Sequence, residues 1–183
     1  MRAHPVAALC FALAAAAPAA CSDPSRDRAL AALPPEDPQG PSPNHRRGQP
    51  CLLCHGEDGD AKPEMVVAGT IYASPEANAN GAENIEVQFV DASGGGPLNN
   101  PFTIAPSGNF YVTKSSWPDL TYPFKVRLLK DGQPIALMTS TVNREGSCNF
   151  CHQPNPPEPY TEEDRERARR SFGQIYAGAA PSP

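Results

Sequence analysis

Residues 84–91 read Asn-Ile-Glu-Val-Gln-Phe-Val-Asp, and apolar side chains occupy every second position from Ile85 to Phe89. This alternation with a period of two predicts a β-strand with one buried face. Other short apolar runs lie on both sides of this strand and are separated by turn residues, such as the Gly-rich stretch at 93–97. Residues 64–147 are therefore predicted to form one mainly β domain.

Six strands are predicted in this region. They cover residues 65–73, 84–91, 101–105, 109–114, 122–130 and 135–142. The last two are joined through Asp131-Gly132, a dipeptide typical of tight hairpin turns. Short strands at this spacing favour an antiparallel β-sandwich. Six antiparallel strands would bring the two termini of the sandwich to the same end, whereas a seventh short edge strand would put them at opposite ends.

The order of these segments resembles the transthyretin-like, or carboxypeptidase-regulatory-like, sandwich family. The resemblance covers roughly residues 64–142 and rests on Val67–Tyr72, Ile85–Val90, Ser107–Tyr111 and Tyr122–Val126. It implies an Ig-like sandwich. Such a fold carries no activity by itself, so the function has to come from residues outside it.

Two copies of one motif flank the sandwich. Residues 51–55 read Cys-Leu-Leu-Cys-His, and residues 148–152 read Cys-Asn-Phe-Cys-His. C-x-x-C-H is the spacing of c-type haem attachment, in which two thiols bond the porphyrin edge and the next residue ligates the iron. The sequence therefore predicts two haem c groups, attached at Cys51, Cys54, Cys148 and Cys151 and ligated by His55 and His152.

The haem-binding segments are predicted to cover residues 51–63 and 148–160. Around the first motif, residues 49–59 resemble the haem-binding segments of bacterial cytochromes c, which often continue C-H-G-x-x-G as Gly56 and Gly59 do here. This resemblance does not extend to the compact helical fold of monohaem cytochromes, because strands follow the motif.

Other uses of the four cysteines remain open. They could form one four-thiolate zinc site, two disulfides or redox-active dithiols. With zinc or disulfides the chain would be a structural or adhesion module, and the zinc site or the disulfides would cross-link the two ends of the sandwich. These alternatives leave the histidine after each cysteine pair unexplained.

Candidates for the distal iron ligands are few. Beyond the first twenty residues the chain has three histidines, and His45 is the one that is not proximal. His45 is either a distal ligand or a surface residue next to two arginines. Met65 and Met138 are the other candidates, although Met138 also suits a core position. At most one haem can therefore have two histidine ligands from this chain.

The first fifty residues are predicted to lie outside the domain. Residues 1–20 have the positive start and the short Ala-rich stretch of a secretory signal peptide. The run 17–21 also resembles a bacterial lipobox, which implies lipid on Cys21 and, with Ser22 next, sorting to the outer membrane; cleavage without lipid stays open. Residues 21–50 contain seven prolines and are predicted to be a disordered tether.

The C-terminal part is predicted to contain a short helix over residues 161–176 and a tail over 177–183. Thr161 can cap this helix, and Phe172, Ile175 and Tyr176 share one face.

Net charge and composition limit the function. The net charge of −5 argues against nucleic acid and favours a basic docking surface on a partner. No nucleophile or acid–base pair indicates an enzyme, although small-ligand or peroxide chemistry at an open haem stays open. The expected function is electron transfer between a donor and an acceptor redox protein in the periplasm or at the cell surface, with membrane contact through a lipid anchor only.

Overall fold

The computed structural model describes residues 23–36, 42–74, 80–153 and 172–177. The predicted signal peptide, Cys21 and residues 161–171 of the predicted helix lie outside these ranges. The described elements are α1 (Pro24–Ala31), α2 (Leu52–His55), β1 (Met65–Tyr72), β2 (Ile85–Asp91), β3 (Phe102–Thr103), β4 (Asn109–Thr113), β5 (Phe124–Lys130), β6 (Gln133–Leu137), α3 (Cys148–Cys151) and β7 (Ile175–Tyr176).

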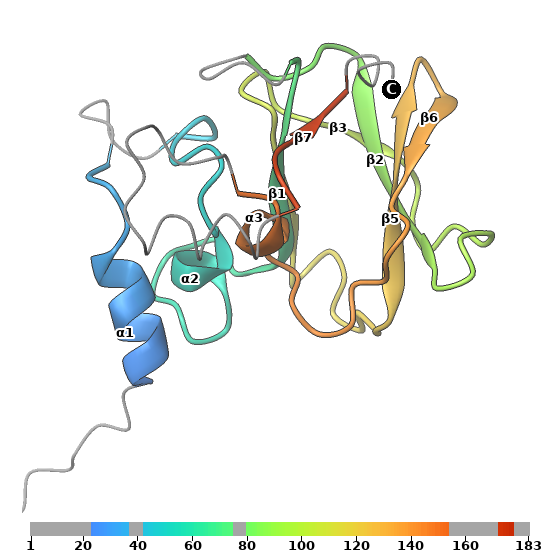
Figure 1. Cartoon of the computed structure of the whole chain (residues 1–183). Helices are drawn as coiled ribbons and strands as arrows, with labels where there is room; N and C mark the ends of the chain where they lie inside the picture. Colours follow the sequence, from blue (N-terminus) through green and yellow to red (C-terminus); the bar gives the residue numbers. More distant parts are fainter. Residues whose placement is uncertain (1–22, 37–41, 75–79, 154–171, 178–183) are drawn as a thin grey trace, which may run out of the picture.

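The strands form two sheets, which confirms that the chain is mainly β. One sheet has the order β4-β1-β7 and the other has the order β3-β2-β5-β6 (Figure 1). All neighbours pair antiparallel except β1 and β7, which are parallel. One apolar core takes side chains from both sheets, among them Val67, Ile71 and Phe110 from the first and Ile85, Val87, Phe89 and Phe124 from the second.

The alternation in residues 84–91 predicts the observed strand β2. Ile85, Val87 and Phe89 are each at most 1% exposed. The Phe89 ring lies 5.3 Å from the Trp117 ring and 5.4 Å from the Phe124 ring, centroid to centroid. Each such buried side chain contributes about 1.5–3 kcal/mol to folding, so this strand anchors the core.

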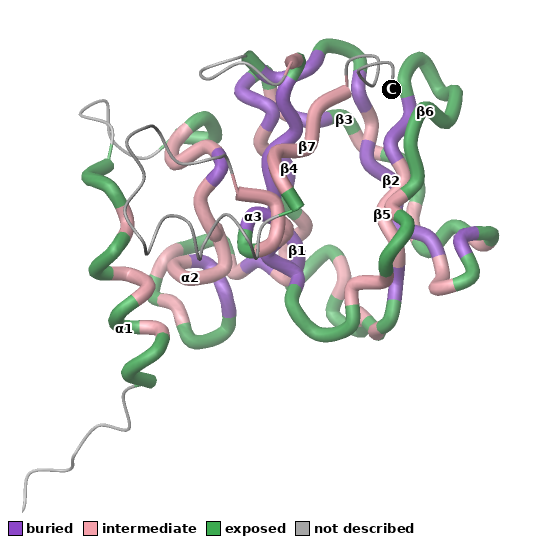
Figure 2. The backbone as a smooth tube through the Cα atoms, in the orientation of Figure 1, coloured by how far each residue is buried: buried purple, intermediate pink, exposed green. Residues whose placement is uncertain are grey.

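The hairpin of β5 and β6 forms at the predicted turn. Asp131 and Gly132 have positive φ angles of 51° and 74°, as a two-residue type I′ hairpin turn requires. This turn starts the pairing of β6 at Gln133. β6 ends at Leu137 rather than at the predicted Val142, which makes only an isolated bridge to Phe124. All of β6 is exposed at the sheet edge (Figure 2). Beyond Leu137 the chain keeps only scattered contacts with β5, from the Met138 N–H to the Val126 carbonyl and between Val142 and Phe124.

Strand β1 is buried on both faces. Every residue of β1 except Val66 is buried (Figure 2). Val67 and Ile71 belong to the core, so Ala68 and Thr70 point to the opposite face because side chains alternate along a strand. Residues 42–50 contact that opposite face, where the backbone N–H of Gly48 donates to Thr70 Oγ1 at 3.0 Å.

The prediction of a disordered tether over residues 21–50 is wrong for the described part of it. Residues 24–31 form α1, because Asp23 Oδ1 accepts from the backbone N–H of Ser25 at 2.9 Å and Pro24 suits the first helical position. Gly48 is buried against the sheet. A high proline content describes the average of the segment, whereas single caps and contacts decide the local structure.

The predicted helix over 161–176 does not extend to Tyr176. Ile175 and Tyr176 form β7 and pair in parallel with Ile71 and Tyr72 of β1. Gly173, with a φ of +76°, lies just before this strand. Ile and Tyr favour strands, and pairing with the open edge of β1 outweighs the short helical pattern.

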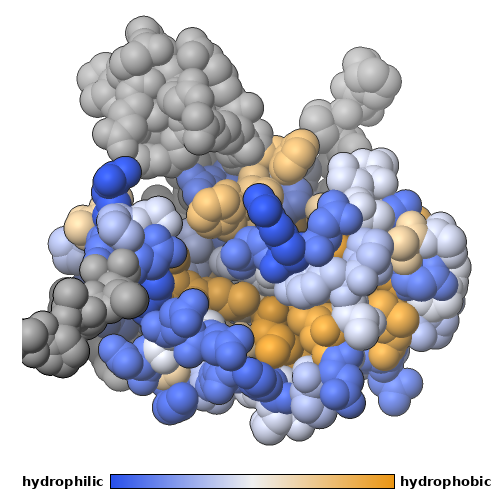
Figure 3. Space-filling model, turned by 90° about the horizontal axis from the view of Figure 1, so that it is seen from below, coloured by the Kyte–Doolittle hydropathy of each residue, from blue (hydrophilic) through white to orange (hydrophobic). Residues whose placement is uncertain are grey.

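Within the described ranges, no helix is long and apolar enough to cross a membrane. Apolar side chains do reach the surface in a hollow on the face seen from below (Figure 3).

Candidate functional site

Each C-x-x-C-H motif folds as a single helical turn. In α2 the backbone N–H of His55 donates to the carbonyl of Cys51 at 2.9 Å, and next to α3 the N–H of His152 donates to the carbonyl of Cys148 at the same distance. Residues three and four positions apart share one side of a helical turn. Each turn therefore brings its two thiols and its imidazole to one side.

Both motifs lie next to β1 (Figure 1). β4 occupies one edge of β1, while the other edge pairs with β7 and, at Ala68, with Ser147 just before the second motif. Both motifs therefore lie against the same strand. Their position differs from the expected one, because they lie along β1 rather than at one end of the sandwich.

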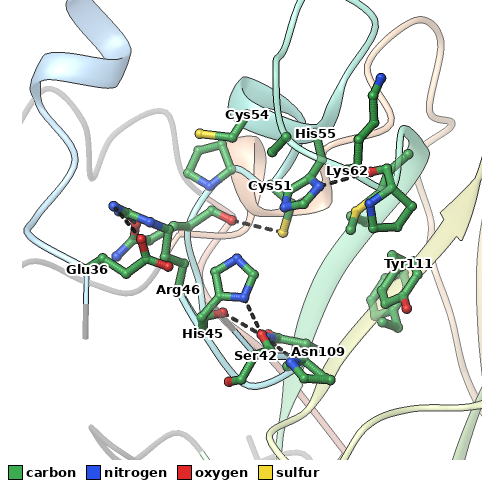
Figure 4. A pocket seen from close by; sticks show the side chains of 18 of the residues that line it. Glu36, Ser42, His45, Arg46, Cys51, Cys54, His55, Lys62, Asn109 and Tyr111 are labelled. Atoms are coloured by element: carbon green, nitrogen blue, oxygen red, sulfur yellow. Dashed lines mark hydrogen bonds and ion pairs between the residues drawn. The ribbon is translucent and has the colours of Figure 1, made fainter. Parts of the chain in front are cut away.

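A cavity of about 520 Å³ adjoins the first motif. This volume is in the range of about 300–1,000 Å³ that small-molecule sites occupy. All three motif residues line the cavity, as do two candidate distal ligands (Figure 4). The lining includes Cys51, Cys54, His55, His45, Met65, Arg46, Lys62, Ala68, Asn109 and Tyr111.

The rings of His45 and His55 face a common space. Their centroids are 5.9 Å apart. A metal–imidazole bond is about 2.0 Å long, so two imidazoles on opposite sides of one metal have centroids about 6 Å apart. The centroid distance of 5.9 Å therefore matches that of two imidazoles on one metal, and the two rings are tilted by 44° to each other.

In both imidazoles Nδ1 is hydrogen-bonded, and Nε2 is the nitrogen that is left to bind a metal. His55 Nδ1 hydrogen-bonds the Pro63 carbonyl at 2.9 Å, and His45 Nδ1 hydrogen-bonds the Ser42 carbonyl. A carbonyl accepts only from a protonated nitrogen, so Nδ1 carries a proton, and in a neutral imidazole the lone pair is then on Nε2. This is the arrangement in which metal-ligating histidines are usually held.

Two of the thiols are partly buried. Burial raises the pKa of Cys51 to about 11 and that of Cys148 to about 12. Cys51 Sγ donates to the Gln49 carbonyl at 3.4 Å. In the haem-free chain these thiols are protonated at neutral pH.

The second motif has a similarly held histidine. His152 Nδ1 hydrogen-bonds the Gly173 carbonyl at 3.1 Å, which again leaves Nε2 free. Burial lowers the pKa of His152, although this hydrogen bond opposes the shift, so the neutral, ligating form is favoured. Phe172, which is 71% exposed, has its ring centroid 5.9 Å from that of His152. Residues 154–171, which connect these groups, lie outside the described ranges.

Met138 is not brought to either motif. It follows β6 at the outer edge of the four-stranded sheet, whereas both motifs contact β1 of the other sheet. It is half-buried rather than part of the core. Met65, by contrast, is buried at the start of β1 and lines the cavity.

The structure also bears on the other uses of the cysteines. No disulfide joins the four cysteines of the two motifs. In the part of the chain that the structure describes, no three His, Cys, Asp or Glu side chains are placed to hold a metal ion together.

Three polar residues near the motifs were missed by the sequence analysis: Thr70, Asn109 and Asn149. Asn149 is the first residue between the cysteines of the second motif and is fully buried. The motif pattern leaves that position free, so no sequence signal marks it.

Comparison with protein-family models, with curated proteins and with solved structures finds no match for this chain.

Proposed function

We propose that this chain is an exported c-type cytochrome that carries two covalently bound haems and transfers electrons. The observation that carries the proposal is the first site: His45 and His55 face each other at 5.9 Å in a cavity that both thiols of a C-x-x-C-H motif also line. Neither histidine alone would indicate this function, but a facing pair beside two thiols matches the needs of haem c.

In the first site each residue has a distinct role. Cys51 and Cys54 would form the thioether bonds, His55 would be the proximal ligand and His45 the distal one. The carbonyls of Pro63 and Ser42 hold the two rings through Nδ1. A bound haem supplies an iron that changes between its ferric and ferrous states and so accepts one electron at a time.

Charged residues at the cavity suit the same group. Arg46 and Lys62 line the cavity, and cations there would offset the negative charges of haem propionates. Arg46 is held in place by hydrogen bonds to the Pro34 carbonyl at 3.1 Å and to Gln49 Oε1 at 3.0 Å, and its guanidinium lies 3.9 Å from a Glu36 carboxylate oxygen.

The second site differs from the first. Cys148 and Cys151 would hold the porphyrin, and His152 would ligate the iron. Of the described residues, no further histidine is left for this iron once His45 serves the first site. The second haem would then be five-coordinate or ligated by a lysine or a water.

The remaining parts of the proposal concern fold type and location. The two sheets and their shared core support an Ig-like, transthyretin-like sandwich. The sequence of residues 1–21 supports export to the periplasm or cell surface, with a lipid on Cys21 as the membrane anchor. A redox protein with a basic docking surface is the partner that the net charge of −5 favours.

The test is expression of the full chain together with cytochrome c maturation machinery. We expect a coloured protein with two covalent haems per chain, measured by haem-stained gels and haem quantification. His45→Ala should convert one of the two haems from low spin to high spin in the absorption spectrum.

Met65→Leu is the matched control, because Met65 lines the same cavity and keeps its volume as leucine. We expect this variant to keep the parent spectrum. A colourless protein, or one in which Met65→Leu and not His45→Ala changes the spin state, would contradict the assignment.

A further inference from the structure

A buried hydrogen-bond network joins the two motifs, and Thr70 of β1 is its centre. Thr70 is 1% exposed. Its hydroxyl accepts from the backbone N–H of Gly48 at 3.0 Å and from Asn149 Nδ2 at 3.0 Å, and it donates to Asn109 Oδ1 at 2.8 Å. A hydroxyl has one donor and two acceptor positions, so all three are used.

Asn149 connects the second motif to the first. Its Oδ1 accepts from the backbone N–H of Thr70 at 3.1 Å. Its Nδ2 donates to the Gln49 carbonyl at 2.9 Å, in addition to the Thr70 hydroxyl. The Gln49 carbonyl also accepts from Cys51 Sγ. Asn149 of the second motif thus holds Gln49, which lies two residues before Cys51 of the first motif.

Asn109 connects the same network to the distal ligand. Its Nδ2 donates to the carbonyl of His45 at 3.0 Å and to the carbonyl of Pro43 at 3.1 Å. The His45 ring is held by the Ser42 carbonyl. The backbone carbonyls of Pro43 and His45 are therefore connected to Asn149 by hydrogen bonds that run through Asn109 and Thr70.

Thr70 and Asn149, at the centre of this network, are buried, whereas Asn109 is half-buried. Asn149 is fully buried, so each of its three bonds replaces one to water. A buried polar group that loses its partner costs about 1–3 kcal/mol, and networks of this kind fix a single arrangement. Loss of Asn149 would therefore free residues 45–49 rather than leave them in place.

We propose that Asn149 is a positioning residue for the distal ligand of the first haem: through Thr70 and Asn109, the second haem-binding motif fixes where His45 lies over the first site. This inference rests on the proposed function, because it takes His45 as an iron ligand. It adds that the two sites are not independent, although Asn149 touches neither iron.

The test uses Asn149→Ala and Asn109→Ala in the full chain loaded with haem. We expect both variants to keep two covalent haems and to lose the low-spin signal of one haem in part, measured by electron paramagnetic resonance. Added free imidazole should restore the low-spin signal, because it replaces a displaced ligand. A purely structural role would lower the melting temperature and leave the spin state unchanged, and that result would overturn the inference.

Asn99→Ala is the matched control. Asn99 Oδ1 accepts from the backbone N–H of Phe89 at 2.7 Å, so this asparagine also ties a loop to a buried strand, but in the other sheet. We expect its spin state to equal that of the parent. If Asn149→Ala does not fold, Asn109→Ala carries the test, because Asn109 is only half-buried.

A second measurement does not depend on haem. In the haem-free chain we expect faster hydrogen exchange over residues 45–49 in Asn149→Ala and Asn109→Ala than in Asn99→Ala. Unchanged exchange there would overturn the positioning role. If the chain takes up no haem when it is expressed with the maturation machinery, the proposed function is refuted. The same difference in hydrogen exchange would then still support the positioning role of Asn149 and Asn109.

Discussion

Gly69 shows how closely the second motif packs on β1. A Cβ atom at this position would lie 2.8 Å from Cys148 Cβ and 2.8 Å from the ring of Phe110. Such contacts are too short, so Gly69→Ala should push the second motif away from the strand. We expect a loss of about 1–3 kcal/mol in the free energy of unfolding, as for other overpacked cores. Thermal or denaturant unfolding measures it.

Gly95→Ala is the control for Gly69→Ala. A Cβ at Gly95 would meet only Ser93 Oγ, at an ordinary distance of 3.5 Å. We expect its stability to stay within about 0.5 kcal/mol of the parent, as for most surface substitutions. Equal stabilities for the two variants would show that the second motif does not pack on Gly69.

The buried thiols give a prediction about the haem-free chain. The pKa of Cys51 is raised to about 11 and that of Cys148 to about 12, both by burial. Because only the thiolate reacts and an ordinary thiol has a pKa of about 8.5, alkylation at pH 8 should be about 100-fold slower or more than in the unfolded chain. Mass spectrometry after iodoacetamide labelling measures both rates.

The pH dependence of this labelling has a definite sign. The thiolate fraction of the folded chain rises as the pH approaches 11–12, so the difference from the unfolded chain should shrink with rising pH. Equal rates at pH 8 would contradict the burial of these thiols.

At the scale of elements, the strands were predictable where local pattern and tertiary packing agree. In β2 the alternation of Ile85, Val87 and Phe89 matches burial in a two-sheet core. The hairpin turn at Asp131-Gly132 was also predictable, because few dipeptides accept two positive φ angles. The motifs themselves could be read from spacing alone.

The elements that sequence missed depend on partners far away in the chain. Segment 42–50 is ordered by Thr70 and Asn109, and β7 exists because the edge of β1 is open next to Ile71 and Tyr72. Nothing within either segment encodes those partners. For the same reason the proximity of His45 to His55 could be proposed from sequence only as one of two alternatives.

The segment 172–177 gives a prediction at this scale. It supplies β7 and the Gly173 carbonyl that holds His152 Nδ1. Such a bond makes the imidazole more basic and stabilises ferric iron. A chain that ends after Ser171 should therefore raise the reduction potential of the second haem and leave that of the first unchanged. Spectroelectrochemical titration measures both potentials.

A chain that ends after Ala177 is the control for that truncation, because it keeps β7 and Gly173. We expect its two potentials to match those of the full chain. A shift of both potentials in the shorter chain would instead indicate a general loss of structure, and no shift would show that Gly173 does not tune the second haem.

At the scale of the whole molecule, the main feature is that two identical motifs form unlike sites. The first has a cavity with a facing histidine pair, held by carbonyls of the segments 42–50 and 61–63. The second lies on the edge of β1 and has Phe172 beside its histidine. Both share β1, so one strand of the sandwich fixes their relative position.

This asymmetry predicts unequal reactivity with carbon monoxide. A ferrous haem with two histidine ligands resists carbon monoxide, because the gas has to displace an imidazole, whereas an open haem binds it directly. We therefore expect the reduced protein to bind one carbon monoxide per two haems, measured by titration of the absorption spectrum. His45→Ala should raise this ratio to two per two haems, because it opens the first site without changing the second. Binding at both haems of the parent chain would mean that His45 does not ligate iron, and binding at neither would mean that the second haem also has a strong distal ligand.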